Sequence, residues 1–107
     1  MIACYLIHFF WLARALDQPF DGKTVVVTHH APSLKSWPQE KTSDFRATYC
    51  NQMDDFFDRY HIDVWIHGHV HAVKEYEYAQ GRVLCNPRGY TGYQVIEGFT
   101  PTRMIEL

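Results

Sequence analysis

The chain contains 107 residues, of which 47% are hydrophobic and 16% aromatic, and its formal net charge is −2 with histidine neutral. This length suits one domain and is too short for two, and so apolar a composition excludes a wholly disordered chain. No run of Lys or Arg is present, so the sequence gives no support to nucleic-acid binding through a basic face.

The first segment, residues 1–13, is apolar apart from His8. It is too short to span a bilayer, and it lacks the basic start and small-residue cleavage site of a signal peptide. We interpret it as core, or as a segment that packs against a part absent from this chain. The cysteines, Cys4, Cys50 and Cys85, are odd in number and far apart. This argues against a disulfide framework and favours a cytoplasmic protein without membrane association.

Residues 9–17 predict a helix that ends before Pro19. One face collects apolar residues at the i, i+3, i+4, i+7 spacing: Phe9, Leu12, Ala13 and Leu16. After a turn at Asp21-Gly22, residues 24–28 predict a strand. Its β-branched run shows no alternation, which is typical of a strand buried on both faces.

Residues 31–43 predict a loop with an exposed Trp37, and residues 44–60 predict a second helix with Asp44 as its N-cap. Helical spacing places one set of apolar side chains on the same face: Phe45, Tyr49, Met53, Phe56, Phe57 and Tyr60. Such a stripe is far more typical of core packing than of a cofactor site, so we assign it to the core.

The second half of the chain reads as strands. Residues 64–67 predict a buried strand, and Gln80-Gly81 predicts a hairpin turn. Further strands are expected at residues 73–78, 82–85, 93–97 and 102–107. This order of elements predicts a single α/β (α+β) domain with one mixed sheet and flanking helices.

Histidines follow two of the predicted strands. His29 comes after residues 24–28, and Gly68-His69-Val70-His71 comes after residues 64–67. Residues at i and i+2 of an extended segment point the same way, so His69 and His71 can share a pocket while Val70 faces the core. Gly68 allows a close backbone approach or a positive φ. Three imidazoles suit Zn, Fe, Ni or Co better than Mg or Ca.

A structural or incidental role is the alternative interpretation for each of these histidines. The chain has 7 histidines, so close pairs also arise by chance in an ordinary small α/β domain. His67 shares the register of His69, and we interpret it as a hydrogen-bonded neighbour of the site. His8 and His61 lie outside both clusters and are interpreted as structural or solvated.

Three blocks, taken in order, resemble the C-terminal half of a calcineurin-like metallophosphoesterase domain. They are residues 25–33 (VVVTHHAPS), 63–71 (DVWIHGHVH) and 85–90 (CNPRGY). Residues 10–16 also resemble the helix that precedes the first block in that family. The resemblance covers essentially the whole chain, and it implies that residues 1–107 form a single partial domain of an αββα sandwich.

The resemblance also implies a chemistry. In that family two divalent metal ions, such as Mn, Fe, Zn or Ni, activate a water molecule that hydrolyses a phosphate ester. By this resemblance His29, His69 and His71 would be metal ligands, and the doubled histidine makes His30 the alternative to His29. Asn86 and Arg88 lie in a loop expected near the pocket, as substrate-side groups or as turn residues.

The family's N-terminal motifs, Asp-x-His, Gly-Asp-x-x-Asp and Gly-Asn-His-Glu/Asp, do not occur in this sequence. They supply the bridging carboxylate, and no catalytic residue is assigned within this chain. We therefore expect a hydrolase fragment, from a truncated or split gene, that binds at most one metal ion and is inactive alone. An N-terminal half chain would complement it, and its open apolar face would otherwise favour self-association. The alternative is a non-catalytic interaction module that binds a single transition metal.

Overall fold

The computed structural model describes residues 2–38 and 50–107, and it shows a mixed α+β fold. Its elements follow the chain as α1 (Ile2–Leu16), β1 (Val25–Thr28), the 3₁₀ helix η1 (Leu34–Ser36), α3 (Asp55–Arg59), β2 (Val64–His67), β3 (Lys74–Tyr78) and β4 (Gly81–Cys85). Among these described helices, none has the length and apolar character that crossing a membrane requires.

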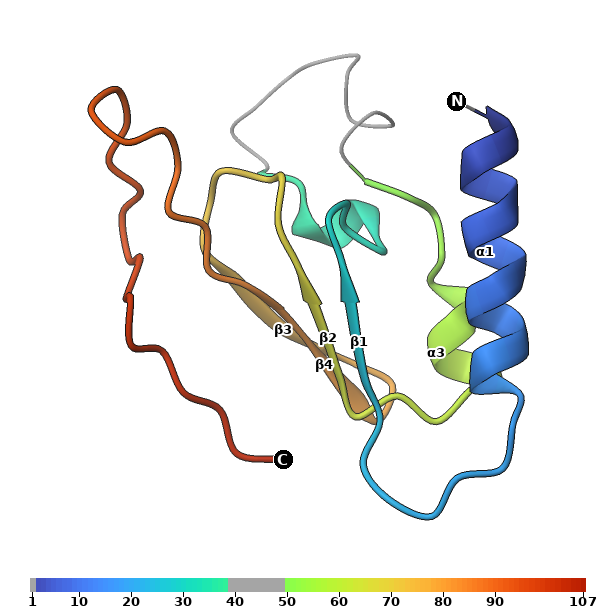
Figure 1. Cartoon of the computed structure of the whole chain (residues 1–107). Helices are drawn as coiled ribbons and strands as arrows, with labels where there is room; N and C mark the ends of the chain where they lie inside the picture. Colours follow the sequence, from blue (N-terminus) through green and yellow to red (C-terminus); the bar gives the residue numbers. More distant parts are fainter. Residues whose placement is uncertain (1, 39–49) are drawn as a thin grey trace.

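The strands form one mixed sheet in the order β1-β2-β4-β3 (Figure 1). β1 and β4 each pair with β2 in parallel, and β3 pairs with β4 as an antiparallel hairpin. The predicted strand at residues 64–67 is confirmed, and the predicted hairpin is confirmed with β4 beginning one residue early, at Gly81. The carboxyl ends of the three parallel strands consequently meet at one edge of the sheet.

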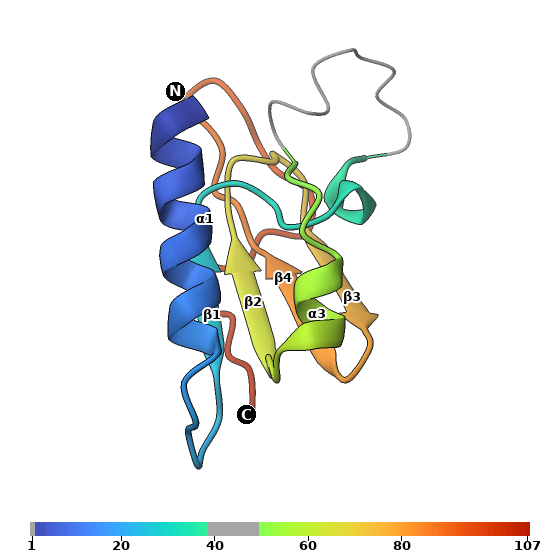
Figure 2. The same cartoon turned by 90° about the vertical axis from the view of Figure 1, so that its right-hand side faces the viewer.

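Helices α1 and α3 cover one face of this sheet (Figure 2). The core between them is formed by Val26, Met53, Phe56, Phe57, Ile62, Trp65 and Val83. The predicted helix face is confirmed, because Phe9, Leu12, Ala13 and Leu16 all pack against this core. α1 starts at Ile2, well before the predicted start at residue 9.

The predicted helix over residues 44–60 is wrong for residues 50–54, and residues 44–49 lie outside the described part. Cys50 forms a parallel bridge with Ala31, and the Met53 amide donates to the Pro32 carbonyl at 2.8 Å. These long-range bonds hold the segment extended, so α3 begins only at Asp55. The core assignment is confirmed at Met53, Phe56 and Phe57, which are buried, and at Tyr60, which packs against them. Phe45 and Tyr49 lie outside the described residues.

The prediction of an exposed Trp37 is also wrong. Its side chain is only 9% exposed, because it packs in a second cluster with Ala31, Cys50, Val70 and Cys85. The turn of η1 just before it folds this part of the predicted loop back onto the sheet edge.

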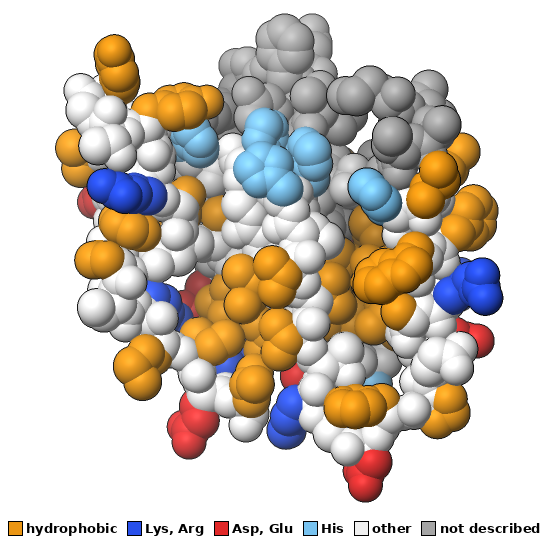
Figure 3. Space-filling model, in the orientation of Figure 1, with side chains coloured by type: hydrophobic (Ala, Val, Ile, Leu, Met, Phe, Trp, Pro, Cys, Tyr) orange, Lys and Arg blue, Asp and Glu red, His pale blue; other side chains and the backbone are white. Residues whose placement is uncertain are grey.

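The other face of the sheet is only partly covered, so the predicted burial of both faces of β1 is wrong. Val26 points into the helix-covered core, but Val27 is 70% exposed and Val25 is 40% exposed. We call this partly covered face the open face. Figure 3 shows hydrophobic side chains gathered in the middle of the view.

The C-terminal segment, residues 86–107, lies on the side of the sheet away from the helices (Figure 1). The strands predicted at 93–97 and 102–107 are wrong, because the segment folds as turns without sheet pairing. Gly89 and Gly98, which flank residues 93–97, take φ values of 76° and 85° that are typical of turns.

Candidate functional site

The candidate site lies at the edge where the parallel strands end. β1 ends at Thr28 and delivers His29 and His30, and β2 ends at His67 and delivers Gly68 and His69. The pairing of Thr28 with His67 aligns these two exits. Histidine side chains gather above the open face in Figure 3. Parallel sheets often place their ligands at this edge.

Three imidazole rings are in mutual contact there. His29 Nε2 lies 3.0 Å from His69 Nδ1. The centroid of the His69 ring lies 4.7 Å from those of both His29 and His30, and the latter two lie 5.3 Å apart. The structure thus brings together His29 and His69 as predicted, together with the alternative residue His30.

Two of the three rings, His69 and His30, are shifted towards the neutral form that can bind a metal. Burial first, and then the neighbouring imidazoles, lowers the pKa of His69. Burial and then the charge of His29 lower the pKa of His30. Both shifts favour the neutral ring, whose unprotonated nitrogen is a metal ligand. A neutral ring can also supply only one hydrogen, so one of His29 Nε2 and His69 Nδ1 donates and the other accepts.

The backbone around Gly68 is fixed from both sides. The Gly68 amide donates to the His29 carbonyl at 2.9 Å, and the Val70 amide donates to the Gly68 carbonyl at 2.6 Å. The positive φ expected at Gly68 occurs instead at His69, at 62°. Val70 is 2% exposed and faces the interior as predicted. This turn directs the His69 ring towards His29.

His71 makes a separate set of contacts. Its Nδ1 lies 2.8 Å from Gln94 Oε1, and its ring packs on Tyr90 with centroids 4.8 Å apart. Because an amide oxygen only accepts, Nδ1 donates this hydrogen bond. His71 also contributes to the lowered pKa of His69. Within residues 2–38 and 50–107, no set of three or more His, Cys, Asp or Glu side chains is arranged as a metal-binding group.

The predicted loop residues differ from each other. Asn86 ties the C-terminal segment to the end of β4, because its side-chain amide donates to the Thr100 carbonyl at 2.7 Å and accepts from the Thr100 amide at 3.2 Å. Arg88 is exposed. Of the two outlying histidines, His61 is solvated beside Asp63 and His8 is exposed.

His67 is confirmed as a hydrogen-bonded neighbour of the site, and it is 4% exposed. Its Nε2 lies 2.9 Å from Ser36 Oγ, and Ser36 Oγ lies 2.7 Å from the Tyr76 hydroxyl. Burial lowers the pKa of His67. Sequence reasoning missed Ser36 and Tyr76, because they meet His67 from distant segments that no local motif connects.

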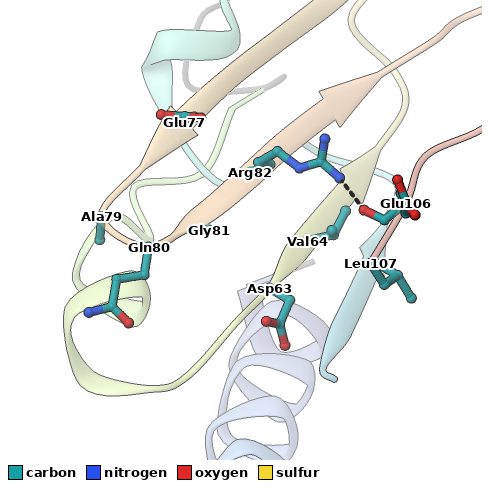
Figure 4. Close-up of a pocket in the computed structure, with 9 residues that line it drawn as sticks. All are labelled: Asp63, Val64, Glu77, Ala79, Gln80, Gly81, Arg82, Glu106 and Leu107. Carbon is teal, nitrogen blue, oxygen red and sulfur yellow. Dashed lines mark hydrogen bonds between the residues drawn. The ribbon is translucent and has the colours of Figure 1, made fainter. Parts of the chain in front are cut away.

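A cavity of about 320 Å³ lies at the opposite end of the sheet (Figure 4). Its lining comes from the start of β2, the β3–β4 hairpin and the last residues: Asp63, Val64, Glu77, Ala79, Gln80, Gly81, Arg82, Glu106 and Leu107. Arg82 Nη2 donates to the Glu106 carbonyl across it at 2.8 Å. The charges around it are mixed, and none of the predicted site residues lines it.

Comparison with known proteins adds no family assignment. The chain matches no family model, no curated protein and no solved structure. The histidines at the sheet edge are therefore the basis of the proposed function.

Proposed function

We propose that the chain is a fragment of a metal-dependent phosphoesterase, carrying the histidine ligands of its metal centre. The observation that carries the proposal is the contact of His29 with His69 at the carboxyl edge of the parallel strands, 3.0 Å between ring nitrogens. Two loops 40 residues apart thus present imidazoles to one place. His71 is the third proposed ligand, and His30 remains the alternative to His29.

The chemistry of the proposed ligands, all imidazoles, suits one transition-metal ion. Neutral imidazoles bind Zn, Ni and Fe, and Mn binds them less readily. A bound ion of this kind polarises a phosphate oxygen and lowers the pKa of its water. The chain's own part would be to hold the ion: His29 and His69 from adjoining loops, and His71 with its Nδ1 hydrogen directed to Gln94. Such a partner on the outer nitrogen orients a ligating imidazole.

A second ion would need carboxylates, and the acids nearest in sequence are engaged elsewhere. Asp63 accepts from the Thr24 amide at 2.7 Å and lies at the other end of β2. Glu75 pairs with Arg103. We therefore propose that the chain holds one ion and does not hydrolyse phosphate esters without a complementary chain.

The proposed architecture is one half of an αββα sandwich. Its support is the open face, where Val25 and Val27 lie exposed on a strand whose composition is typical of two-sided burial. A complementary N-terminal half chain would supply the second sheet. Without it, the same face would favour self-association.

The second candidate is a non-catalytic module that binds a single transition metal. The observation that favours it is that Asp63 bonds to Thr24 and Glu75 pairs with Arg103, so neither carboxylate is available to bridge a second ion. The two candidates share the ligands and differ in whether a partner chain restores turnover.

Titration of the purified chain with Zn²⁺ and Ni²⁺ tests the ligand assignment. We expect binding of one ion, weakened at least about tenfold by His69→Ala. His61→Ala is the matched control, because His61 is exposed and far from the sheet edge that carries the ligands. Equal affinity for the wild-type chain and His69→Ala would contradict the assignment.

Hydrolysis of phosphate monoesters and diesters with Mn²⁺ separates the two candidates. The chain is assayed alone and co-expressed with an N-terminal segment that carries Asp-x-His and Gly-Asp-x-x-Asp. We expect turnover only in the second case. Turnover by the lone chain that His71→Ala abolishes would overturn the claim that a partner chain is needed.

A further inference from the structure

A series of three hydrogen bonds, one buried and two partly buried, leads to the histidine site. The Tyr76 hydroxyl lies 2.7 Å from Ser36 Oγ, and Ser36 Oγ lies 2.9 Å from His67 Nε2. His67 Nδ1 lies 3.0 Å from the Gly68 carbonyl. The bonds thus link η1, β3 and the end of β2 to the loop that carries His69.

The donor and the acceptor of each of these three hydrogen bonds follow from the chemistry of the groups. A carbonyl only accepts, so His67 Nδ1 donates to Gly68. Nε2 of the neutral ring is then an acceptor, so the Ser36 hydroxyl donates to it. The remaining hydrogen comes from Tyr76, which donates to Ser36. His67 is therefore held as the Nδ1–H tautomer.

Burial prevents water from replacing these partners. Ser36 is 0% exposed and His67 is 4% exposed. Within the described residues, no buried side-chain nitrogen or oxygen lacks a partner. Removing one hydroxyl would leave a buried acceptor unsatisfied, which costs more than the bond itself contributes.

These hydrogen bonds constrain the backbone at Gly68. Its carbonyl accepts from both His67 Nδ1 and the Val70 amide, and its amide donates to the His29 carbonyl. The next residue, His69, has a φ of 62°. A side chain in this left-handed region is unfavourable unless its surroundings impose it. The three bonds to Gly68 supply that constraint.

The neighbouring histidine loop is held in a similar way. Trp65 Nε1 donates to Thr28 Oγ1 at 2.9 Å, and Thr28 Oγ1 donates to the His30 carbonyl at 2.6 Å. Both loops are thus fixed at a backbone carbonyl by a relay from a side chain of β2. Because the same arrangement occurs in both histidine loops, these hydrogen bonds position the loops as well as satisfy polar groups of the interior.

We propose that Ser36 and Tyr76 are positioning residues which, through His67, hold His69 in the conformation that faces His29. This inference rests on the proposed function only in naming His69 as a metal ligand. It couples the segment around η1 to the proposed metal site through His67.

The test combines the tautomer of His67 with Zn²⁺ affinity in the full chain. Long-range ¹H–¹⁵N NMR is expected to show the Nδ1–H tautomer of His67 in the wild-type protein. Ser36→Ala should add the Nε2–H form and weaken Zn²⁺ binding by about tenfold to a hundredfold. Tyr76→Phe keeps the ring and removes only the outer donor, so its effect on both readouts should be smaller.

Ile62→Ala is the matched control, because Ile62 is 4% exposed and lies before β2, at the end of the strand opposite His67. It should lower stability and leave the His67 tautomer unchanged. Wild-type tautomer and affinity in both Ser36→Ala and Tyr76→Phe would overturn the proposal. If the wild-type chain bound no Zn²⁺, the proposed function would fail. The positioning role would then be judged from the tautomer and from the His29–His69 ring contact by NMR.

Discussion

The two faces of the sheet are built from the same strands and differ sharply in cover. On the face towards α1 and α3, Trp65 and Val83 are 0% exposed, while on the open face Val27 is 70% exposed. Successive residues of a strand alternate between faces, so adjacent residues of β1 lie in different environments. The helix-covered face therefore provides the stability of the described fold, while the open face is the surface proposed for association.

The largest contrast is expected from truncating one side chain on each face. Phe56→Ala removes a fully buried ring that packs against Phe9 with centroids 5.0 Å apart. It should lower the free energy of unfolding by about 3–5 kcal/mol. Val27→Ala should change it by less than about 0.5 kcal/mol. Urea denaturation measures both, and equal losses would show that the two faces are equally covered.

Glycine-to-alanine substitutions at two positions also distinguish the helix-covered core from the exposed C-terminal segment. A Cβ at Gly81 would lie 2.4 Å from the Ile62 carbonyl oxygen, and that backbone supports the helix-covered core. Gly81→Ala should lower the free energy of unfolding by about 1–3 kcal/mol. Gly92→Ala is the control, since φ is 83° there but no atom lies within 4 Å of the added Cβ. Its cost should be about 1 kcal/mol. A larger loss at Gly92, measured by thermal unfolding, would contradict this ranking.

The open face should matter for association more than for stability. Replacing Val27 with Asp places a charge where an apolar contact between copies would form, so self-association should weaken at least about tenfold, or 1.4 kcal/mol. Sedimentation over a range of concentrations measures this effect. Val95→Asp is a matched control, because Val95 is 96% exposed on the C-terminal segment. Equal effects of the two substitutions would refute a specific role for the open face.

Local patterns in the sequence were sufficient for the parts of the fold that depend on neighbours in the chain. Strand β2 has its predicted bounds, and Val70 faces the interior, because alternation and the turn at Gly68 act over a few residues. His69 lies at the sheet edge for the same reason, because it follows the end of β2 within two residues. Its contact with His29 follows from parallel pairing of two strand ends.

The remainder depends on contacts between distant segments. The helix predicted across residues 50–54 is absent because Cys50 pairs with Ala31. The Ser36–His67 bond joins residues 31 apart, and no periodicity indicates it. The composition of β1 does not indicate whether one face or both faces are covered by another layer. For this reason its valines were predicted to be buried on both faces.

The smallest effect is expected at the polar end of β2, away from both apolar faces. There Asp63 accepts from the Thr24 amide, and this bond, aided by the charges of His61 and Lys23, lowers the pKa of the carboxyl. Because the folded-state pKa lies below the unfolded value of about 3.9, this contribution is present above that pH. It is lost as the pH falls through the folded-state pKa.

Asp63→Asn should therefore lower the urea midpoint at pH 7, and the difference from wild type should shrink towards pH 3. Asp21→Asn is the control, since Asp21 is exposed before β1. A difference that stays constant between pH 7 and pH 3 would show that the ionised carboxylate does not tie β1 to β2. The Thr24 bond would then contribute equally when an amide oxygen accepts it.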